Sequence, residues 1–129
     1  MPKYMLLFYA EDPASDEEAA ERDANLPLWL ELGESLEKAG LLAANGRLQP
    51  TDMATTVRVR DGETELTDGP FAVTKEILGG YYLLDCANLD EALKVAARAP
   101  IAQYGSVEVR PVMDLSQMTA HAQADAASA

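Results

Sequence analysis

The stretch "ATTVRVRDGETELTDG", residues 54–69, divides the chain into two halves of similar design. Apolar or β-branched residues alternate with polar ones over residues 55–60, and Asp61-Gly62 then leads into a second alternating run over residues 63–67. An Asp-Gly pair between two alternating runs is typical of a β-hairpin with a type I′ turn. We therefore predict a hairpin over residues 54–67, with one half of the chain on either side of it.

Each half contains two predicted strands. In the first half, "KYMLLFY" at 3–9 is apolar on both of its alternating faces, and "LLAANGRLQP" at 41–50 is predicted to be a strand that bends at Asn45-Gly46. In the second half the strands are "GYYLLDC" at 80–86 and "SVEVRPVM" at 106–113. A strand that is apolar on both faces is expected to be covered on both sides.

A predicted helical segment joins the two strands of each half. Ser15 with Glu18 three residues later forms a capping-box signal. From there a single helix, or a pair of helices bent near Pro27, is predicted to continue to about Ala39. In the second half, "NLDEALKVAARAP" at 88–100 has an Asn cap and a closing Pro, so it predicts another helix.

The order of these elements predicts an α+β fold. A β-α-β unit, a hairpin and a second β-α-β unit match the ferredoxin-like subunit, in which two helices cover one face of an antiparallel sheet. Strand 80–86 places Tyr82 and Leu84 on one face and Tyr81 and Leu83 on the other. One layer of helices cannot cover both apolar faces, so we predict a homodimer that packs sheet against sheet.

Length and composition indicate one soluble domain. The chain has 129 residues and a net charge of −12, and ten of its 22 acidic residues lie between Glu11 and Glu37. Residues 1–113 are expected to form the domain, and the Ala-rich residues 114–129 a mobile tail or a marginal helix. The negative charge disfavours nucleic-acid binding, because a phosphate backbone would be repelled.

Several further classes of protein are excluded at this level. No apolar run reaches the roughly 18 residues of a membrane span, and no signal peptide is recognised, so a cytoplasmic location is expected. The single Cys86 rules out an intramolecular disulfide and a cysteine metal cluster. No metal-ligand spacing and no nucleotide-binding motif is found, so no cofactor is predicted.

Four segments together resemble a known family. They are "KYMLLFY" at 3–9, "ATTVRVRDG" at 54–62, "DGPFAVTKEILGGYYLLD" at 68–85 and "VEVRPV" at 107–112. In this order they resemble the YCII-related family, in its DGPF-motif branch, over residues 3–113. The resemblance implies a ferredoxin-like subunit that forms a dimeric α+β barrel.

The resemblance also implies two kinds of function. Some relatives resemble lactone isomerases or dehydrochlorinases that act on small ring compounds, with a His–Asp pair suggested as acid and base. Members of the DGPF branch are associated with alternative sigma factors by gene neighbourhood. The only histidine here, His121, lies in the tail beyond the last predicted strand, so the domain itself does not offer a His–Asp pair.

Asp68 is the candidate catalytic residue. An Asp in a turn commonly accepts a hydrogen bond from the backbone N–H two residues on, but that position is Pro70, which has no N–H. The carboxylate must therefore use the Phe71 N–H, a remote donor, water or a ligand. Phe71 itself is most simply interpreted as a core residue at the end of the sheet.

Five other side chains are candidate ligand-binding residues: Tyr9, Trp29, Arg58, Tyr81 and Arg110. The two tyrosines are expected to turn a hydroxyl toward the interior of the barrel, where it needs a partner. Trp29 lies beside the apolar stripe of its helix, as core, rim or pocket wall. An arginine directed toward Asp68 would form a carboxylate-binding site, although exposed ion pairs are the simpler interpretation.

Three functional hypotheses follow. The first is a homodimer that binds a small molecule in a pocket near Asp68, with lyase- or isomerase-type acid–base activity. The alternative is a non-catalytic regulatory or ligand-sensing module linked to transcription through sigma-factor association. The third is a dimeric structural module in which the Asp-Gly-Pro-Phe motif only forms a corner.

Overall fold

The computed structural model describes residues 1–116 of the chain. Most of the predicted tail, including His121, lies outside the described residues. The described elements in chain order are β1 (Lys3–Ala10), α1 (Asp16–Asp23), α2 (Leu26–Lys38), β2 (Leu42–Arg47), the 3₁₀ turn η1 (Thr51–Met53), β3 (Thr55–Arg60), β4 (Glu63–Asp68), β5 (Ile77–Asp85), α3 (Leu89–Arg98), the 3₁₀ turn η2 (Pro100–Gln103) and β6 (Ser106–Pro111).

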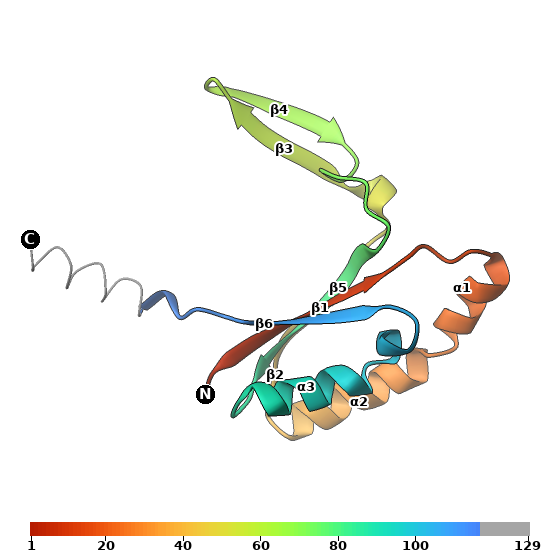
Figure 1. Cartoon of the computed structure of the whole chain (residues 1–129), viewed down its shortest axis with the longest axis vertical. Helices are drawn as coiled ribbons and strands as arrows, with labels where there is room; N and C mark the ends of the chain where they lie inside the picture. The colour runs from red at the N-terminus through yellow and green to blue at the C-terminus, as the bar shows by residue number, and fades with distance from the viewer. Residues whose placement is uncertain (117–129) are drawn as a thin grey trace, which may run out of the picture.

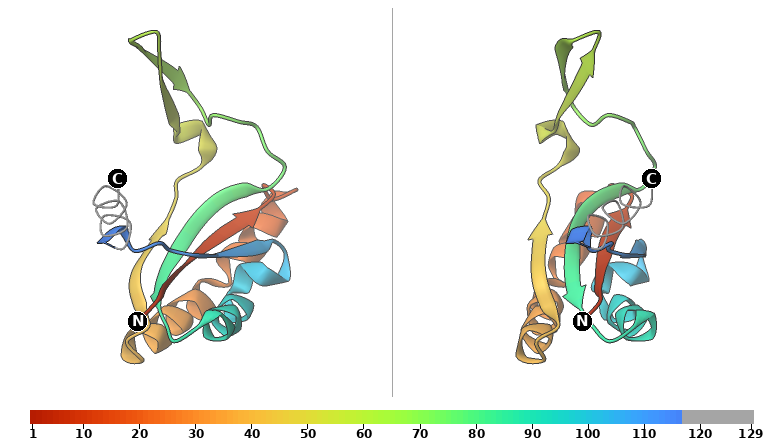
Figure 2. Two further views of the ribbon diagram at one scale, coloured as in Figure 1. Left: turned by 60° about the vertical axis from the view of Figure 1, so that its left-hand side comes forward. Right: turned by 90° about the vertical axis from the view of Figure 1, so that its left-hand side faces the viewer.

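Four of the strands form one antiparallel sheet in the order β2-β5-β1-β6. The outer strand β2 belongs to the first half of the chain and pairs with β5 of the second half, while β6 pairs with β1. Helices α2 and α3 lie side by side on one face of this sheet (Figures 1 and 2). This interleaved order confirms the predicted ferredoxin-like α+β fold.

The core lies between the sheet and the two helices. Leu6 and Leu84, from the two central strands, are fully buried, and Leu36 of α2 is 1% exposed. Side chains alternate between the two faces of a strand, so Leu6 and Leu84 point toward the helices. The apolar residues of the helices fall on one stripe, which faces the sheet. The remaining buried apolar residues are Phe8, Leu32, Tyr82, Cys86, Ala92, Val95, Ala96, Ala99 and Ile101.

The helix boundaries follow the capping signals. The Glu18 N–H donates to Ser15 Oγ at 3.1 Å, and the Asn88 side chain in the same way accepts from Glu91 N–H at 2.9 Å. Of the two predicted alternatives for the first helical segment, the pair of helices is correct, because α1 ends at Asp23 and Pro27 lies in the first turn of α2.

Strands β3 and β4 form a separate two-stranded hairpin, which we call the arm, and it stands away from the four-stranded sheet (Figure 1). Asp61 and Gly62 at its tip have φ values of 52° and 78°. Positive φ at both central residues defines the predicted type I′ turn. The cross-strand pair Val57 and Leu66 is 60% and 69% exposed, so the arm contributes nothing to the core of its own subunit.

The sheet face opposite the helices has an apolar centre, flanked by the Lys3–Asp85 ion pair and by Glu108 and Arg110 of β6, and no helix within residues 1–116 covers it. This open face carries Met5, Leu7 and Tyr9 from β1 and Tyr81 and Leu83 from β5, all of them half-buried. It is the second apolar face that the sequence predicted.

The predicted bend of β2 at Asn45-Gly46 is wrong. Strand β2 passes straight through Gly46 in register with β5, and its irregularity lies earlier, between Leu42 and Ala44. A Cβ atom at position 46 would lie 2.7 Å from the ring of Tyr81. Gly46 is therefore needed for the close approach of an aromatic ring, not for a turn.

Candidate functional site

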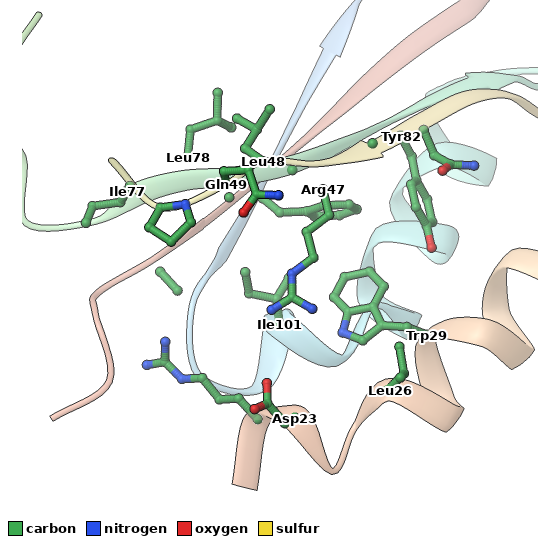
Figure 3. A pocket seen from close by; sticks show the side chains of 18 of the residues that line it. Asp23, Leu26, Trp29, Arg47, Leu48, Gln49, Ile77, Leu78, Tyr82 and Ile101 are labelled. Carbon is green, nitrogen blue, oxygen red and sulfur yellow. The ribbon is translucent and has the colours of Figure 1, made fainter. Parts of the chain in front are cut away.

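A cleft of about 1340 Å³ lies between helices α1 and α2 and the helix-covered face of the sheet (Figure 3). The segment 47–51, which leaves β2, and the start of β5 contribute its other side. Small-molecule sites in proteins commonly have volumes of about 300–1000 Å³, so this cleft has room for a ligand with solvent beside it.

Three aromatic rings form one wall of the cleft. Phe8, Trp29 and Tyr82 pack edge to face, with ring centroids 5.1 Å apart for the two pairs that include Phe8 and 6.0 Å apart for Trp29 and Tyr82. Phe8 and Tyr82 belong to the core, while Trp29 is half-buried at its edge. Edge-to-face contacts fix the ring orientations, so the wall is rigid before any ligand arrives.

Gly33 keeps the space in front of this wall open. It lies one turn after Trp29 on α2 and lines the cleft. A Cβ atom at this position would be 4.0 Å from the Tyr82 hydroxyl and would meet no other atom within that distance. A larger side chain at Gly33 would therefore occupy the cleft without displacing the backbone.

Polar groups project into the cleft opposite the aromatic wall. The Arg47 guanidinium enters it beside the Trp29 indole, and the Asp23 carboxylate lies on the helix side, facing the guanidinium (Figure 3). Neither group forms a hydrogen bond or ion pair with any residue between 1 and 116, and the same holds for the Tyr82 hydroxyl. Such groups are available to a ligand.

Burial raises the pKa of Tyr82 above the ordinary tyrosine value of 10.0. The folded protein therefore holds this proton more tightly than the unfolded chain does. The resulting stabilisation is fully present below pH 10.0 and is lost as the pH rises through the pKa of the folded state. At neutral pH the phenol is a hydrogen-bond donor.

We expect Tyr82→Phe to reduce the loss of stability at alkaline pH. The free energy of unfolding, measured by urea denaturation between pH 8 and about 11, should fall less steeply in the variant above the ordinary tyrosine pKa. Cys86, whose pKa is also raised, chiefly by burial, contributes equally in both proteins, so the difference isolates Tyr82. Superimposable pH profiles would contradict this assignment.

Comparison with known proteins identifies the family. A model of the YCII-related domain matches residues 3–116, which is nearly the whole described chain. The chain belongs to the YCII-related family. The predicted placement in the DGPF branch remains a prediction.

One relative of this YCII-related protein is an uncharacterized protein of Rhizobium meliloti (strain 1021), which is 53% identical over 77 residues. The match covers 58% of this chain and 62% of the relative, so it spans less than two thirds of the relative's length.

Of the six predicted site residues, Trp29 lines the cleft. Tyr9, Tyr81 and Arg110 lie on the open face, on the other side of the sheet from Trp29. Arg110, on the edge strand β6, has its Nε 4.0 Å from Glu108 Oε1. Arg58, on the arm, donates weakly to the Phe71 carbonyl at 3.4 Å. Within one described chain, therefore, the open face brings three of these side chains to the same side of the sheet, whereas Trp29 and Arg58 lie elsewhere.

Asp68 ends strand β4 at the base of the arm, where it is exposed and does not line the cleft. The corner around it is held by the neighbouring residues, since Gly69 N–H donates to the Ala54 carbonyl at 2.7 Å and Thr56 Oγ1 donates to the Gly69 carbonyl at 2.8 Å. No hydrogen bond to the Asp68 carboxylate is found within residues 1–116, as expected with Pro70 two residues on. Its catalytic role stays a prediction.

The interpretation of Phe71 as a core residue is wrong. Its side chain is 77% exposed, because the motif lies at the base of the arm and not at the end of the four-stranded sheet. The helices that form the core are on the far side of the sheet and cannot reach it.

The residues that sequence reasoning missed are Asp23, Gly33, Arg47 and Tyr82. The strand alternation correctly puts Tyr82 on the same sheet face as Leu84, but it does not predict that the Tyr82 hydroxyl lines a cleft. Arg47 could be assigned to the helix-covered face only if the irregularity between Leu42 and Ala44 were known.

In the described chain no group of three His, Cys, Asp or Glu side chains is arranged to hold a metal ion. None of its helices is long and apolar enough to cross a membrane.

Proposed function

We propose that this YCII-related protein binds a small molecule in the cleft between α2 and the sheet. The observation that carries the proposal is the rigid aromatic wall of Phe8, Trp29 and Tyr82, open to a cleft in which Arg47 and Asp23 have no partners among the described residues. A largely apolar concave surface with a few convergent polar groups is the usual design of a small-molecule site.

The protein is further proposed to be a homodimer that packs through the open faces of its sheets. The half-buried Met5, Leu7, Tyr81 and Leu83 form a continuous apolar surface there, and the sheet itself separates them from the cleft. A second subunit on the open face would bury this surface and leave the cleft accessible to a ligand.

The first two functional hypotheses both involve ligand binding, and they differ in the role of Asp68. Lyase- or isomerase-type acid–base chemistry by Asp68 requires the base of the arm, or that of a second subunit, to reach the ligand, since Asp68 is outside the cleft of its own chain. A ligand-sensing module linked to transcription requires only the cleft. The proposal of ligand binding does not depend on the choice.

Filling the cleft is expected to abolish binding. Gly33→Leu places a branched side chain against the Tyr82 hydroxyl and, because leucine is a better helix former than glycine by about 0.8 kcal/mol, it should not unfold α2. A set of small aromatic and aliphatic acids, alcohols and amides would be screened on the wild type by saturation-transfer NMR. Compounds that bind should lose at least about tenfold in affinity in the variant.

Two further variants complete this experiment. Glu31→Leu adds the same side chain to an exposed position of α2 that does not line the cleft, and it should bind like the wild type. Asp68→Asn shows whether the arm takes part: unchanged affinity would remove Asp68 from ligand binding. Compounds that bind Gly33→Leu as tightly as wild type would place the site elsewhere and refute the proposal.

A further inference from the structure

The two arginines that line the cleft differ in their partners. Arg22 is engaged through both of its terminal nitrogens: Nη2 contacts Glu18 at 2.9 Å and Nη1 donates to the Glu11 carbonyl at 2.8 Å. Its guanidinium also lies 4.5 Å from the centre of the Tyr104 ring, and only its buried Nε has no partner among the described residues. Arg47 has no such contacts among the described residues, although its guanidinium projects into the same cleft. Arg22 therefore stabilises the fold, whereas Arg47 is left available for a ligand.

An available guanidinium beside an aromatic wall selects one kind of chemical group. The planar fork of arginine donors matches a carboxylate, which it binds through two parallel hydrogen bonds. Phe8, Trp29 and Tyr82 offer a flat apolar surface on the adjacent side of the cleft. A flat apolar ring with an attached carboxylate would use both features together.

The charges around the cleft limit the ligand further. The acidic residues that line it are Glu11, Asp12, Asp23, Glu34 and Glu37. Glu11 pairs with Lys75 at 3.2 Å and Glu34 with Lys38 at 2.9 Å, whereas the other three carboxylates have no partner among residues 1–116. A polyanion such as a nucleotide would be repelled by this lining and by the net charge of −12. A single carboxylate can be matched by Arg47, and a hydrogen-bond donor at the other end of the ligand can be matched by Asp23.

We infer that the cleft takes a small aromatic monocarboxylate that also carries a hydrogen-bond donor, with its carboxylate on Arg47, its ring against Trp29 and Tyr82 and its donor toward Asp23. This inference rests on the proposed function, since it names the class of ligand for the same cleft. It assigns roles to Arg47 and Asp23 that neither the sequence motifs nor the family comparison indicates.

Three matched probes test the inference on the full chain. para-Hydroxyphenylacetate has all three features, para-hydroxyphenylacetamide replaces the carboxylate by a neutral amide of similar shape, and phenylacetate lacks the donor. Affinities would be measured by isothermal titration calorimetry, with each probe raised to about 10 mM. The acid should bind at least about tenfold more tightly than the amide, because only the acid forms the charge-assisted pair with Arg47.

Arg47→Gln should remove this preference. The variant is expected to bind the acid at least about tenfold more weakly and the amide nearly as well as wild type. Arg60→Gln loses the same charge at the exposed arm, away from the cleft, and should leave all three affinities unchanged. In Asp23→Ala, which has no side-chain acceptor, the hydroxylated acid should lose its advantage over phenylacetate.

The inference is overturned by any of three results: no measurable binding of the acid, equal binding of acid and amide by the wild type, or equal effects of Arg47→Gln and Arg60→Gln. Gly33→Leu distinguishes this failure from failure of the proposed function. If uncharged compounds bind and Gly33→Leu excludes them, the cleft is a binding site but not one for carboxylates. If Gly33→Leu leaves the acid bound, the cleft itself is not the site.

Discussion

Replacing Leu84 by alanine is expected to lower the free energy of unfolding by about 2–5 kcal/mol. Leu84 is fully buried on the central strand β5, between the sheet and the layer of α2 and α3. Removing its side chain takes away apolar burial and leaves a cavity that the paired strands on either side cannot close. Urea unfolding followed by far-UV circular dichroism, at one fixed protein concentration, would measure the change.

Leu93→Ala is the matched control for this substitution. It removes the same atoms from α3, but Leu93 is 47% exposed, so the substitution removes less buried apolar surface. Its cost should be below about 1 kcal/mol. Equal losses of stability in the two variants would mean that the core does not lie between the sheet and the helices as described.

The fold was predictable because local signals along the chain agree with one another. The capping pairs of Ser15 with Glu18 and of Asn88 with Glu91 set the starts of two helices, and the structure confirms the backbone hydrogen bond in each. Asp61-Gly62 specifies the turn of the arm through positive φ angles that other residue pairs adopt at a cost. Such signals depend on a few neighbouring residues and can be interpreted without knowledge of long-range contacts.

The candidate site could be predicted only in small part, because it depends on long-range register. Trp29 was singled out as the only tryptophan of an amphipathic helix, and it does line the cleft. Arg47 enters the same cleft only because β2 shifts register against β5 between Leu42 and Ala44. A shift of one residue moves every later side chain to the other face, and the sequence contains no local signal for it.

The DGPF motif is the most conspicuous local pattern in the sequence, but its residues Asp68 and Phe71 do not line the cleft. Pro70 offers no N–H to the Asp68 carboxylate, and no hydrogen bond to that carboxylate is found within residues 1–116. The interpretation of Phe71 as a core residue was wrong, because its side chain is 77% exposed at the base of the arm. The missing donor at Pro70 can be inferred from the sequence, whereas the location of the motif at the base of the arm cannot.

Leu83→Asp is expected to raise the dissociation constant of the proposed homodimer at least about 100-fold, which corresponds to about 2.7 kcal/mol. Leu83 neighbours the fully buried Leu84 in sequence but lies on the open face, opposite Met5 of β1. In a two-fold symmetric interface each substitution occurs twice, and each would bury a carboxylate without a partner. Sedimentation equilibrium over a range of protein concentrations would measure the constant for wild type and variant.

Ala97→Asp provides the control, because it adds the same charge at an exposed position of α3 on the helix-covered side of the sheet. This variant should dimerise like the wild type, since helices and sheet separate it from the open face. A wild-type protein that is monomeric at micromolar concentration, or equal weakening by both substitutions, would contradict the proposed interface. If only Leu83→Asp dissociates the dimer while its subunit stays folded by circular dichroism, the two faces of the sheet have separate functions. One face then forms the core and the cleft, and the other joins the subunits.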